Sequence, residues 1–340
     1  MSSEIGVSDR QIIHLLTRDP RMPFAELATL LGVSVQTAAR RYQRLVRDGV
    51  LRCTTFLNPQ AVHGLDSWVL QITPKPGRGT ALAAALTRHP GISWVNVTAG
   101  HVTCLFSARA DDDRDDMLIE RLPKTSLVQS VSAFQEVHRF PVSTAWPDFT
   151  DLLTPAQRGW SERRAHLAAA TGHPDGPIAL TGTDYALLRV LGTDARASHA
   201  AIAAHTGLPR SRVRDRLREL TDAGAVYFDL EVARSALGFS MHVTVTAHIA
   251  PRHLQAVGEA LSANREIPFV CVTTGRTNIF AVIFCRTAGD YYKLLTGALA
   301  GITGLDELEA HTNLQQVQHL RTIGRPGISE GIASGKHKTP

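Results

Sequence analysis

Cysteine, lysine and long apolar runs are scarce in this chain of 340 residues. The four cysteines stand far apart, with no Cys-x-x-Cys pair and no close cluster of cysteine and histidine. This spacing excludes a disulfide scaffold and a zinc site of ordinary spacing. No apolar run approaches the ~20 residues that a membrane span needs. The polar stretch from Met1 to Arg10 contains no apolar core of a signal peptide. We therefore expect a soluble protein of a reducing compartment, without a membrane partner.

Basic residues slightly outnumber acidic ones, 36 to 31, which gives a formal net charge of +5. Only five of the 36 basic residues are lysine. This mild excess is compatible with a nucleic-acid partner but does not by itself indicate one. The length favours about two domains, or more if they are small.

The chain repeats itself at a constant offset of 175 residues. An alignment of Ser8–Leu51 with Thr183–Val226 needs no gap, and ten of its 44 positions are identical. Matching glycines and a shared apolar periodicity support the repeat. The identical pairs are Asp9/Asp184, Leu16/Leu191, Asp19/Asp194, Arg21/Arg196, Ala25/Ala200, Ala28/Ala203, Gly32/Gly207, Arg41/Arg216, Leu45/Leu220 and Gly49/Gly224.

The similarity continues past this block, after one small gap. Gly64 pairs with Gly238, Pro76 with Pro251, and the segment Val97–Gly100 with Val272–Gly275. Each unit therefore has two parts and fills about half of the chain. We expect first parts at 5–60 and 181–235, second parts at 64–140 and 238–323, a proline-rich linker with one basic helix at 141–180, and a disordered tail at 325–340.

The first part of each unit is predicted to be a winged helix-turn-helix. Ser8 and Gln11 have the spacing of a capping box that opens the first helix. Pro23 can open a second helix as its first residue. Gly32 ends that helix, and Ser34 caps a third. The short extended segments after each third helix, Val50–Leu57 and Ala225–Val232, are expected to form wings.

The outward face of the third helix carries the functional prediction. In the first copy this helix buries Ala38, Tyr42 and Leu45, and no acidic residue interrupts it from Ser34 to Arg47. Glutamine can pair with adenine edges, and arginine with guanine or phosphate, when a recognition helix enters the major groove. The predicted DNA-binding residues are Ser34, Gln36, Thr37, Arg40, Arg41 and Arg44 in the first copy, and Arg210, Ser211, Arg212, Arg214 and Arg216 in the second.

The two copies differ in charge. Residues 8–52 carry 8 basic and 4 acidic residues, or +4, whereas residues 183–226 carry 7 and 5, or +2, because Asp215 and Glu219 dilute the second helix. The first copy is thus predicted to be the stronger DNA reader. An arginine-rich helix can also be a merely solvated face. Arg41 and Arg216 lie beside the buried stripe, so an ion pair and a phosphate contact are equally open for them.

The second part of each unit is predicted to have the order βαββαβ, a ferredoxin-like layout within an α+β fold. It shows no nucleophile elbow, phosphate loop or metal pair, so no catalytic residue, metal or cofactor is expected. The predicted elements are 68–73, 79–89, 92–98, 102–108, 117–122 and 127–138 in the first copy, and 242–249, 252–263, 269–274, 279–286, 290–299 and 308–318 in the second.

This combination resembles the Lrp/AsnC family of bacterial transcriptional regulators, here in tandem form. The residues that carry the resemblance are Ser8-Asp9 and Thr183-Asp184 at the first helix, Gly32 and Gly207 in the turn, and the runs Arg41…Leu45…Gly49…Leu51 and Arg216…Leu220…Gly224…Val226. In that family the second part, the RAM domain, dimerises through its sheets and can bind an amino acid at the interface. The family's Gly-x-x-Asp signature is Gly100-His101-Val102-Thr103 and Gly275-Arg276-Thr277-Asn278 here, so the acidic residue is missing twice.

The resemblance implies an effector site at Thr98, Gly100, His101, Thr103, Thr273, Gly275, Arg276 and Asn278. Without the acidic residue, the effector can be another small molecule, or there can be none. The resemblance also implies a cytoplasmic, nucleoid-associated regulator of double-stranded DNA, without enzymatic activity, that forms homo-oligomers through its RAM sheets. The two halves are expected to pack as a pseudo-dimer on an imperfect palindrome, or with one half bound mainly through phosphates.

Two other functions remain open. Siroheme decarboxylases are similar to Lrp/AsnC proteins, and in such an enzyme His101 and Arg276 would be candidate ligands or proton donors. A ligand-binding regulator that acts only through protein partners is the third possibility.

Overall fold

The computed structural model describes two compact units, and each brings together segments from both halves of the sequence. The described residues within 5–64 and 147–233 belong to the first unit, and those within 65–146 and 234–318 to the second. The described residues are 5–89, 91–109, 114–140, 146–147, 149–170 and 176–318. The predicted tail at 325–340 lies outside them, as do parts of the predicted linker.

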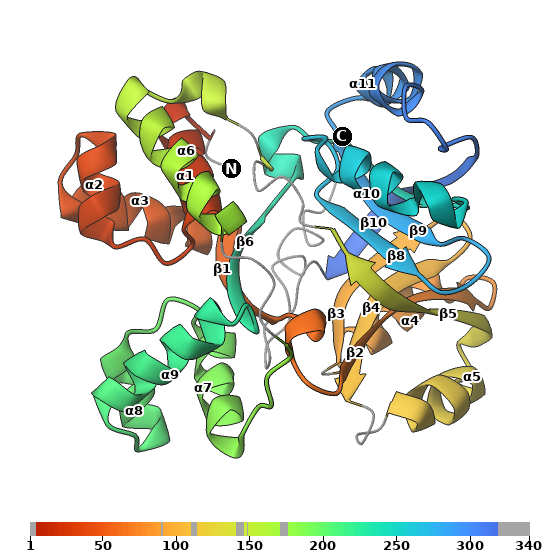
Figure 1. Cartoon of the computed structure of the whole chain (residues 1–340), viewed down its shortest axis with the longest axis horizontal. Helices are drawn as coiled ribbons and strands as arrows, with labels where there is room; N and C mark the ends of the chain where they lie inside the picture. The colour runs from red at the N-terminus through yellow and green to blue at the C-terminus, as the bar shows by residue number, and fades with distance from the viewer. Residues whose placement is uncertain are drawn as a thin grey trace, which may run out of the picture. The chain divides into compact units, whose positions relative to one another are not determined.

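The first unit contains two sets of three helices (Figure 1). In each set the second and third helices pack on one another, and the first contributes the apolar face that the sequence predicts. The sets are α1 (Val7–Arg18), α2 (Phe24–Leu31) and α3 (Val35–Arg47), and α7 (Gly182–Thr193), α8 (His199–Thr206) and α9 (Arg210–Asp222). Short 3-10 turns in this unit are Pro59–Ala61 and Thr150–Leu152.

The predicted helix ends are confirmed at most positions, with two corrections. Gly32 and Gly207 follow α2 and α8 in the left-handed conformation, at φ 65° and 71°, which glycine adopts without a Cβ clash. Ser34 caps α3 as predicted. Pro23 is the N-cap of α2 rather than its first helical residue.

The capping box of α1 lies two residues before the predicted pair of Ser8 and Gln11. Helix α1 begins a residue before Ser8, because Asp9 at the third position accepts the backbone N–H of Gly6 at 3.2 Å. In α7 the same role falls to Asp184, which accepts from the backbone N–H of Thr181 at 2.7 Å. An aspartate at this position satisfies an orphan donor and complements the helix dipole.

The two predicted wings are one shared ribbon. Strands β1 (Leu51–Leu57) and β6 (Val226–Val232) pair antiparallel with each other along their whole length (Figure 1). Thr54 faces Asp229 at the centre of this ladder, and 54 + 175 = 229. Away from this central pair, equivalent residues such as Leu51 and Val226 lie at equal distances on opposite sides of the ribbon centre. The expectation of separate wings is wrong, because each strand finds its backbone partners in the other copy.

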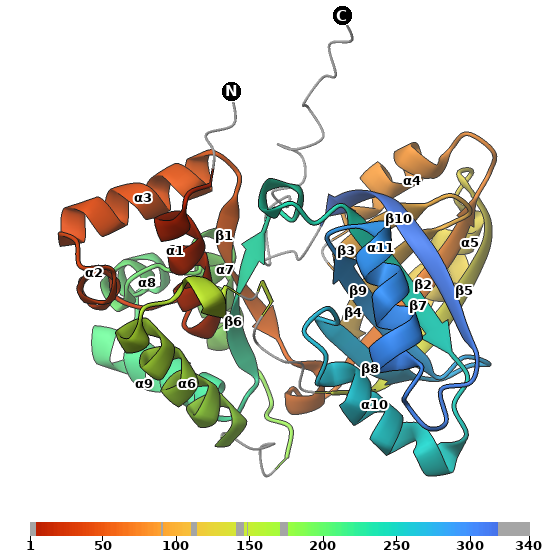
Figure 2. The same cartoon turned by 90° about the horizontal axis from the view of Figure 1, so that it is seen from above.

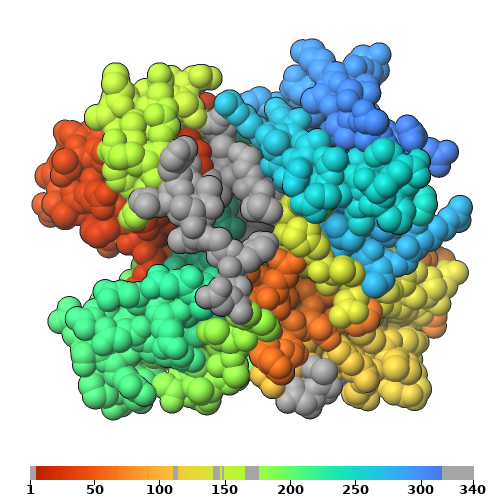
Figure 3. Space-filling model, viewed as in Figure 1, coloured from red at the N-terminus to blue at the C-terminus, as the bar shows by residue number. Residues whose placement is uncertain are grey.

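The predicted linker helix is present as α6 (Pro155–Ala170) and packs against the first helix set. Gln157 donates to the carbonyl of Leu30 at 3.0 Å, and Trp160 donates to the carboxylate of Glu26 at 2.7 Å. His14, fully buried in α1, lies 3.0 Å from the hydroxyl of Ser161. Figure 3 shows the yellow-green surface of α6 lying against the red surface of the first set. The segment is thus a structural part of the first set rather than a simple spacer.

The second unit is a closed antiparallel barrel of eight strands (Figure 2). Around the barrel the order is β10-β3-β4-β2-β5-β8-β9-β7. The strands are β2 (Leu65–Pro74), β3 (Ile92–Thr98), β4 (Val102–Arg109), β5 (Val128–Arg139), β7 (Met241–Ala247), β8 (Phe269–Thr273), β9 (Ile279–Cys285) and β10 (Leu308–Gln318).

Each half contributes four consecutive barrel strands in the βαββαβ order that the sequence predicts. The halves are joined at two seams, where β5 pairs with β8 and β3 pairs with β10. The helical segments are α4 (Gly79–Leu86), the π-helical turn Asp116–Arg121 with α5 (Leu122–Lys124), α10 (Leu254–Ser262), and α11 (Ala288–Leu294) with the π-helical turn Leu295–Leu299. Short 3-10 turns are Ser235–Leu237 and Pro251–His253.

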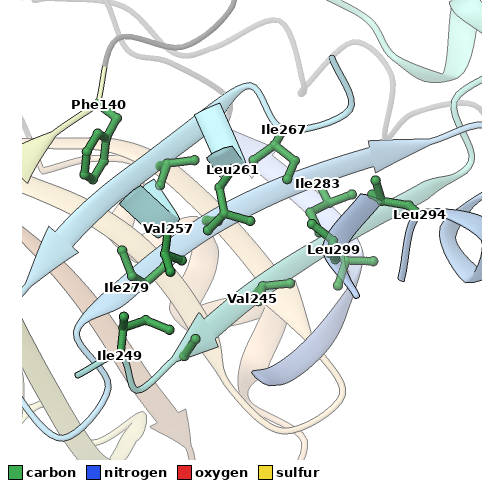
Figure 4. Close-up of a cluster of buried hydrophobic side chains, with 14 of the residues drawn as sticks. Phe140, Val245, Ile249, Val257, Leu261, Ile267, Ile279, Ile283, Leu294 and Leu299 are labelled. Carbon is green, nitrogen blue, oxygen red and sulfur yellow. The ribbon is translucent and has the colours of Figure 1, made fainter. Parts of the chain in front are cut away.

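Alternate residues of the strands build separate cores on the two faces of the barrel wall. Outward residues pack under the helices, as in the cluster of Figure 4, which includes Val245, Ile283, Val257 and Leu261. Phe140, which follows β5, inserts its ring into this cluster of the other half. An inward cluster fills part of the barrel interior and comprises Val69, Trp94, Leu105, Cys271, Phe280, Val282 and Phe284.

Candidate nucleic-acid interface and effector site

The first turn of α3 is fixed by its cap. The Ser34 hydroxyl accepts the backbone N–H of Thr37 at 3.1 Å and lies 2.9 Å from the Thr37 hydroxyl. Ala38 and Leu45 are buried, so the opposite face of α3 is turned to solvent. Gln36 and Arg40 are exposed on that face. This is the arrangement that a recognition helix needs, with a rigid backbone and polar side chains aimed outward.

The side chains of Arg41 and Arg44, on α3, both pair with one buried carboxylate. Arg44 Nη2 lies 2.5 Å from Asp9 Oδ2, and Arg41 Nη1 lies 3.5 Å from Asp9 Oδ1. The Asp9 side chain is only 3% exposed, whereas those of Arg41 and Arg44 are 38% and 31% exposed. Arg41 thus forms the ion pair that was one of its two predicted roles. Arg44, also a predicted DNA-binding residue, is bound to Asp9 of α1 as well.

Helix α9 presents the second set of predicted residues. Arg210, Ser211 and Arg212 are exposed around its first turn. Arg214 is also exposed, and its Nε donates to the neighbouring Asp215 at 2.8 Å. Val213, Leu217 and Leu220 form the buried face of α9, as predicted.

Arg216 is held more firmly than its counterpart Arg41. Its Nε and Nη2 each donate at 2.7 Å to one oxygen of Asp184, a two-pronged geometry that favours arginine over lysine. Asp184 is fully buried, and its bonds to Arg216 and Thr181 lower the pKa of its carboxyl although burial alone would raise it. Arg216 Nη1 also lies 2.7 Å from Glu219. The ion pair left open for Arg216 is formed.

Arg21 and Arg196, which were not assigned to any site from the sequence, hold the two helix sets in position. Arg21 Nη2 donates to the carbonyl of Ala197 at 2.8 Å, and Arg196 Nη2 donates to the carbonyl of Met22 at 2.6 Å. Each guanidinium also lies over an aromatic ring, Arg21 over Phe228 at 4.8 Å and Arg196 over Phe24 at 4.7 Å. The signal was present in the sequence, because Arg21/Arg196 and Asp9/Asp184 are identical pairs of the repeat.

The predicted effector residues of the first half form the hairpin between β3 and β4. The Thr98 hydroxyl donates to the carbonyl of His101 at 2.9 Å and accepts the backbone N–H groups of Gly100 and His101. The His101 ring meets the ring of His311, on β10, edge-on at 4.6 Å. Burial lowers the pKa of His101, and His311 lowers it further, so the ring is neutral at neutral pH.

A group of unpartnered polar atoms lies beside this hairpin on the inner face of the barrel. Asn96 and Thr103 are fully buried and face each other across β3 and β4. Within the described residues, neither polar atom of the Asn96 amide has a hydrogen-bond partner, and neither does the Thr103 hydroxyl. Asn313 faces Thr98 and donates to the Thr244 hydroxyl at 2.9 Å, but its carbonyl oxygen also has no partner there. Buried polar groups are costly unless they are satisfied by a ligand or by water.

The predicted effector residues of the second half lie at the other seam. Thr273 donates to the carbonyl of Thr277 at 3.3 Å, and the Asn278 amide bonds both backbone groups of Ile249 at 2.8 Å. The carbonyl of Arg276 lies 2.8 Å from the His248 ring. Gly275, at φ 106°, lies against the Phe134 ring of β5. Two strands separate the seams on either side of the barrel, so the eight predicted residues form two groups rather than one site.

Among the described residues, no three histidine, cysteine, aspartate or glutamate side chains gather closely enough to hold a metal ion. The helices of this same part of the chain include none with the length and apolar character for crossing a bilayer.

Comparisons with known proteins find a known domain family in both helix sets. The family model for the AsnC-type helix-turn-helix domain matches residues 8–46 and again residues 180–221. The chain is 30% identical over 139 residues to the HTH-type transcriptional regulator LrpA of Mycobacterium tuberculosis, covering 39% of this chain and 90% of that protein. It is 27% identical over 143 residues to the HTH-type transcriptional regulator FL11 of Pyrococcus furiosus, covering 39% and 94%.

A solved structure shares the fold over almost the whole chain. The siroheme decarboxylase NirDL superposes with a TM-score of 0.60 at 12% identity, covering 96% of this chain and 97% of that one. At this identity the likeness concerns the fold alone. The two domain matches and the similarity to LrpA over nine tenths of its length place the sequence more closely: the chain belongs to the Lrp/AsnC family.

Proposed function

We propose that the protein is a sequence-specific, DNA-binding transcriptional regulator. The observation that carries this proposal is α3, a capped helix of an AsnC-type helix-turn-helix that holds Gln36 and Arg40 exposed opposite its buried face. Arg41 and Arg44 add positive charge beside them, and Asp9 holds their guanidinium groups in place. Glutamine and arginine on such a face are suited to base edges and phosphates. The remaining predicted contacts, including those of α9, belong to the same proposal.

We further infer that the two halves of one chain are paired in the way that the two subunits of a symmetric dimer would be. The repeat offset of 175 residues coincides with the β1–β6 register, in which Thr54 faces Asp229. Both RAM-type halves also share one barrel, and all eight of its strands are paired on both edges. A second copy therefore finds no free strand edge in this barrel to pair with. Homo-oligomers through the sheets, as the sequence predicts, would have to use other surfaces of the unit.

An effector, if the protein uses one, is proposed to bind at the β3–β4 hairpin. The support is the group of unpartnered polar atoms on Asn96, Thr103 and Asn313. These side chains carry no charge, and His101 beside them is neutral at neutral pH. A neutral polar molecule that both donates and accepts hydrogen bonds suits this surface better than the charged amino group of a free amino acid.

DNA binding is tested by fluorescence anisotropy with a mixed-sequence duplex and with duplexes selected from a random pool. Arg40→Ala is the cleanest variant, since Arg40 is exposed and its side chain makes no ion pair or hydrogen bond within the part of the chain that the structure describes. Loss of one such contact weakens binding by about 1–3 kcal/mol. Arg88→Ala, an equal charge change at an exposed position of the barrel unit, is the control. Wild-type protein that binds no duplex at low salt would reject the proposal.

A tetrapyrrole-modifying enzyme is the second candidate. The observation that favours it is the fold shared with NirDL over 96% of the chain, together with the paired rings of His101 and His311 in the barrel unit. Titration with siroheme separates the two functions. An absorbance change that is lost in His101→Ala, followed by decarboxylated product, would support the enzyme. An unchanged spectrum together with DNA binding would support the regulator.

A further inference from the structure

Three outward positions carry opposite charges in the two predicted recognition helices. In α3, Arg40 and Arg47 are exposed on the side opposite the buried residues Ala38 and Leu45. Arg44 lies next to them, half-buried by its ion pair with Asp9. At the repeat offset of 175 residues, these three positions correspond to Asp215, Glu219 and Asp222 in α9. Three positive charges in one helix are thus replaced by three negative charges in the other. We call the second set the acidic stripe.

The acidic stripe is turned to solvent. The side chains of Asp215 and Glu219 are 56% and 64% exposed, and Asp222 is exposed as well. Val213, Leu217 and Leu220 are buried on the opposite side of α9. The helix register is therefore the same in both copies, and the charge difference is not compensated by a rotation of α9.

The ion-pair groups beside α3 and α9 also have net charges of opposite sign. In the first copy, Arg41 and Arg44 share one carboxylate, that of Asp9, so the group carries +2 − 1 = +1. In the second copy, Arg216 alone is shared by Asp184 and Glu219, so the group carries +1 − 2 = −1. The ion-pair group beside α3 is therefore cationic, and the equivalent group beside α9 is anionic.

Three arginines of α9 lie beside the acidic stripe, and a fourth, Arg212, continues its line toward the first turn, three residues before Asp215. Arg210, Arg214 and Arg218 occupy the positions of Val35, Ala39 and Gln43 in α3. Successive helix positions are about 100° apart, so this basic row is turned by one residue from the row of Arg40 and Arg44. One member, Arg214, is already paired with Asp215.

We propose that the acidic stripe of Asp215, Glu219 and Asp222 keeps α9 out of the major groove, so that α3 is the helix that reads DNA. This inference rests on the proposed function and deepens it. A groove is lined by phosphates on both sides, and carboxylates at the outward centre of a helix are repelled by them. Arg210, Arg214 and Arg218 contact phosphates from the flank at most. Most contacts with the DNA are then made by α3, in the first half of the chain.

The test is a reciprocal exchange of two stripe positions. Asp215→Arg combined with Glu219→Arg gives α9 the charges of α3, and Arg40→Asp combined with Arg44→Glu does the reverse. Asp306→Arg combined with Glu307→Arg, two exposed positions of the barrel unit, matches the first variant in charge. Affinity for a mixed-sequence duplex is measured by anisotropy at several salt concentrations.

The α9 variant is expected to bind at least tenfold more tightly than the wild type near 0.1 M salt. Its slope of log affinity against log salt should steepen by about two, since each new phosphate contact adds about 0.9. The α3 variant should lose at least tenfold. Hydroxyl-radical footprints on selected DNA should show one protected patch for the wild type and two patches for the α9 variant, about one helical turn apart.

The outcomes separate this inference from the proposed function. If wild type binds DNA but the α9 variant gains no more affinity than the Asp306/Glu307 control, the acidic stripe does not exclude α9 from the groove. Two equal footprints from the wild type would overturn the inference in the same way. If wild type binds no DNA at low salt, the proposed function fails and the inference falls with it. Thermal unfolding of each variant identifies misfolding, and Glu219→Gln, a nearly isosteric change, should still give a partial gain.

Discussion

Arg21 and Arg196 exchange equivalent hydrogen bonds across the helical unit. Arg21 donates to the carbonyl of Ala197, and Arg196 donates to the carbonyl of Met22. Since 21 + 175 = 196 and 22 + 175 = 197, each arginine bonds the residue that follows the other. The two helix sets are thus clasped by one contact used twice, close to the ribbon that pairs Thr54 with Asp229.

Removal of this clasp is expected to loosen the helical unit. A hydrogen bond from a charged group contributes about 1.5–3 kcal/mol. Arg21→Ala combined with Arg196→Ala should therefore lower the free energy of unfolding by about 3 kcal/mol or more, as followed by far-ultraviolet circular dichroism in urea. Arg78→Ala combined with Arg88→Ala, at two exposed positions of the barrel unit, removes the same charge and is the control. Equal stability of the Arg21/Arg196 variant and this control would contradict a clasp.

Gly258→Ala is expected to destabilise the barrel unit. A Cβ at Gly258 would lie 2.0 Å from the Phe140 ring, far inside contact distance, so the ring would have to leave the core of Figure 4. Overpacking of this kind costs about 1–3 kcal/mol. Gly297→Ala, where nothing lies within 4 Å of the added carbon, is the control and should be neutral or slightly stabilising. The prediction is checked by thermal unfolding, and a Gly258 variant as stable as the control would refute it.

Stability is expected to fall in mild acid because of His101. Burial lowers the pKa of this ring below its ordinary value of 6.5, the neighbouring His311 lowers it further, and Glu309 opposes both effects. Between the folded-state pKa and 6.5 the unfolded chain binds more protons than the folded one, so stability decreases as pH falls through this window and levels off below it. Unfolding in urea at several pH values should show this slope for wild type and a shallower one for His101→Gln. An identical slope in both proteins would count against His101 as its origin.

The four cysteines are expected to resist thiol reagents in the folded protein. All four are buried, and burial raises the pKa of Cys53 to about 12 and that of Cys285 to about 11, with Cys104 and Cys271 raised as well. The thiolate is the reactive form. A chromogenic disulfide reagent at pH 8 should therefore label no cysteine until denaturant is added. Fast labelling of any one thiol in buffer would show that its site opens.

The sequence was sufficient for the local structure, because local rules decide it. Gly32 ends α2 because glycine adopts the left-handed conformation, and Ser34 begins α3 because its hydroxyl caps the helix. Both effects depend on near neighbours in the sequence. The alternation of apolar residues likewise predicted the barrel strands, and β10 has the predicted bounds of 308–318. The start of α1 was missed, since Gly6 offers no side chain that marks a cap.

The partners of these elements were decided only by the tertiary structure. A strand such as β1 carries unpaired backbone groups, but nothing in its own residues says that they are met by β6 rather than by a wing within the same domain. For the same reason the predicted effector residues fell at two seams, β3–β10 and β5–β8, which involve strands far apart in the sequence. The charges of α3 and α9 could be counted in the sequence. That Arg44 binds Asp9 while Glu219 binds Arg216 required the packed structure, because such pairs depend on helix faces brought together from distant segments.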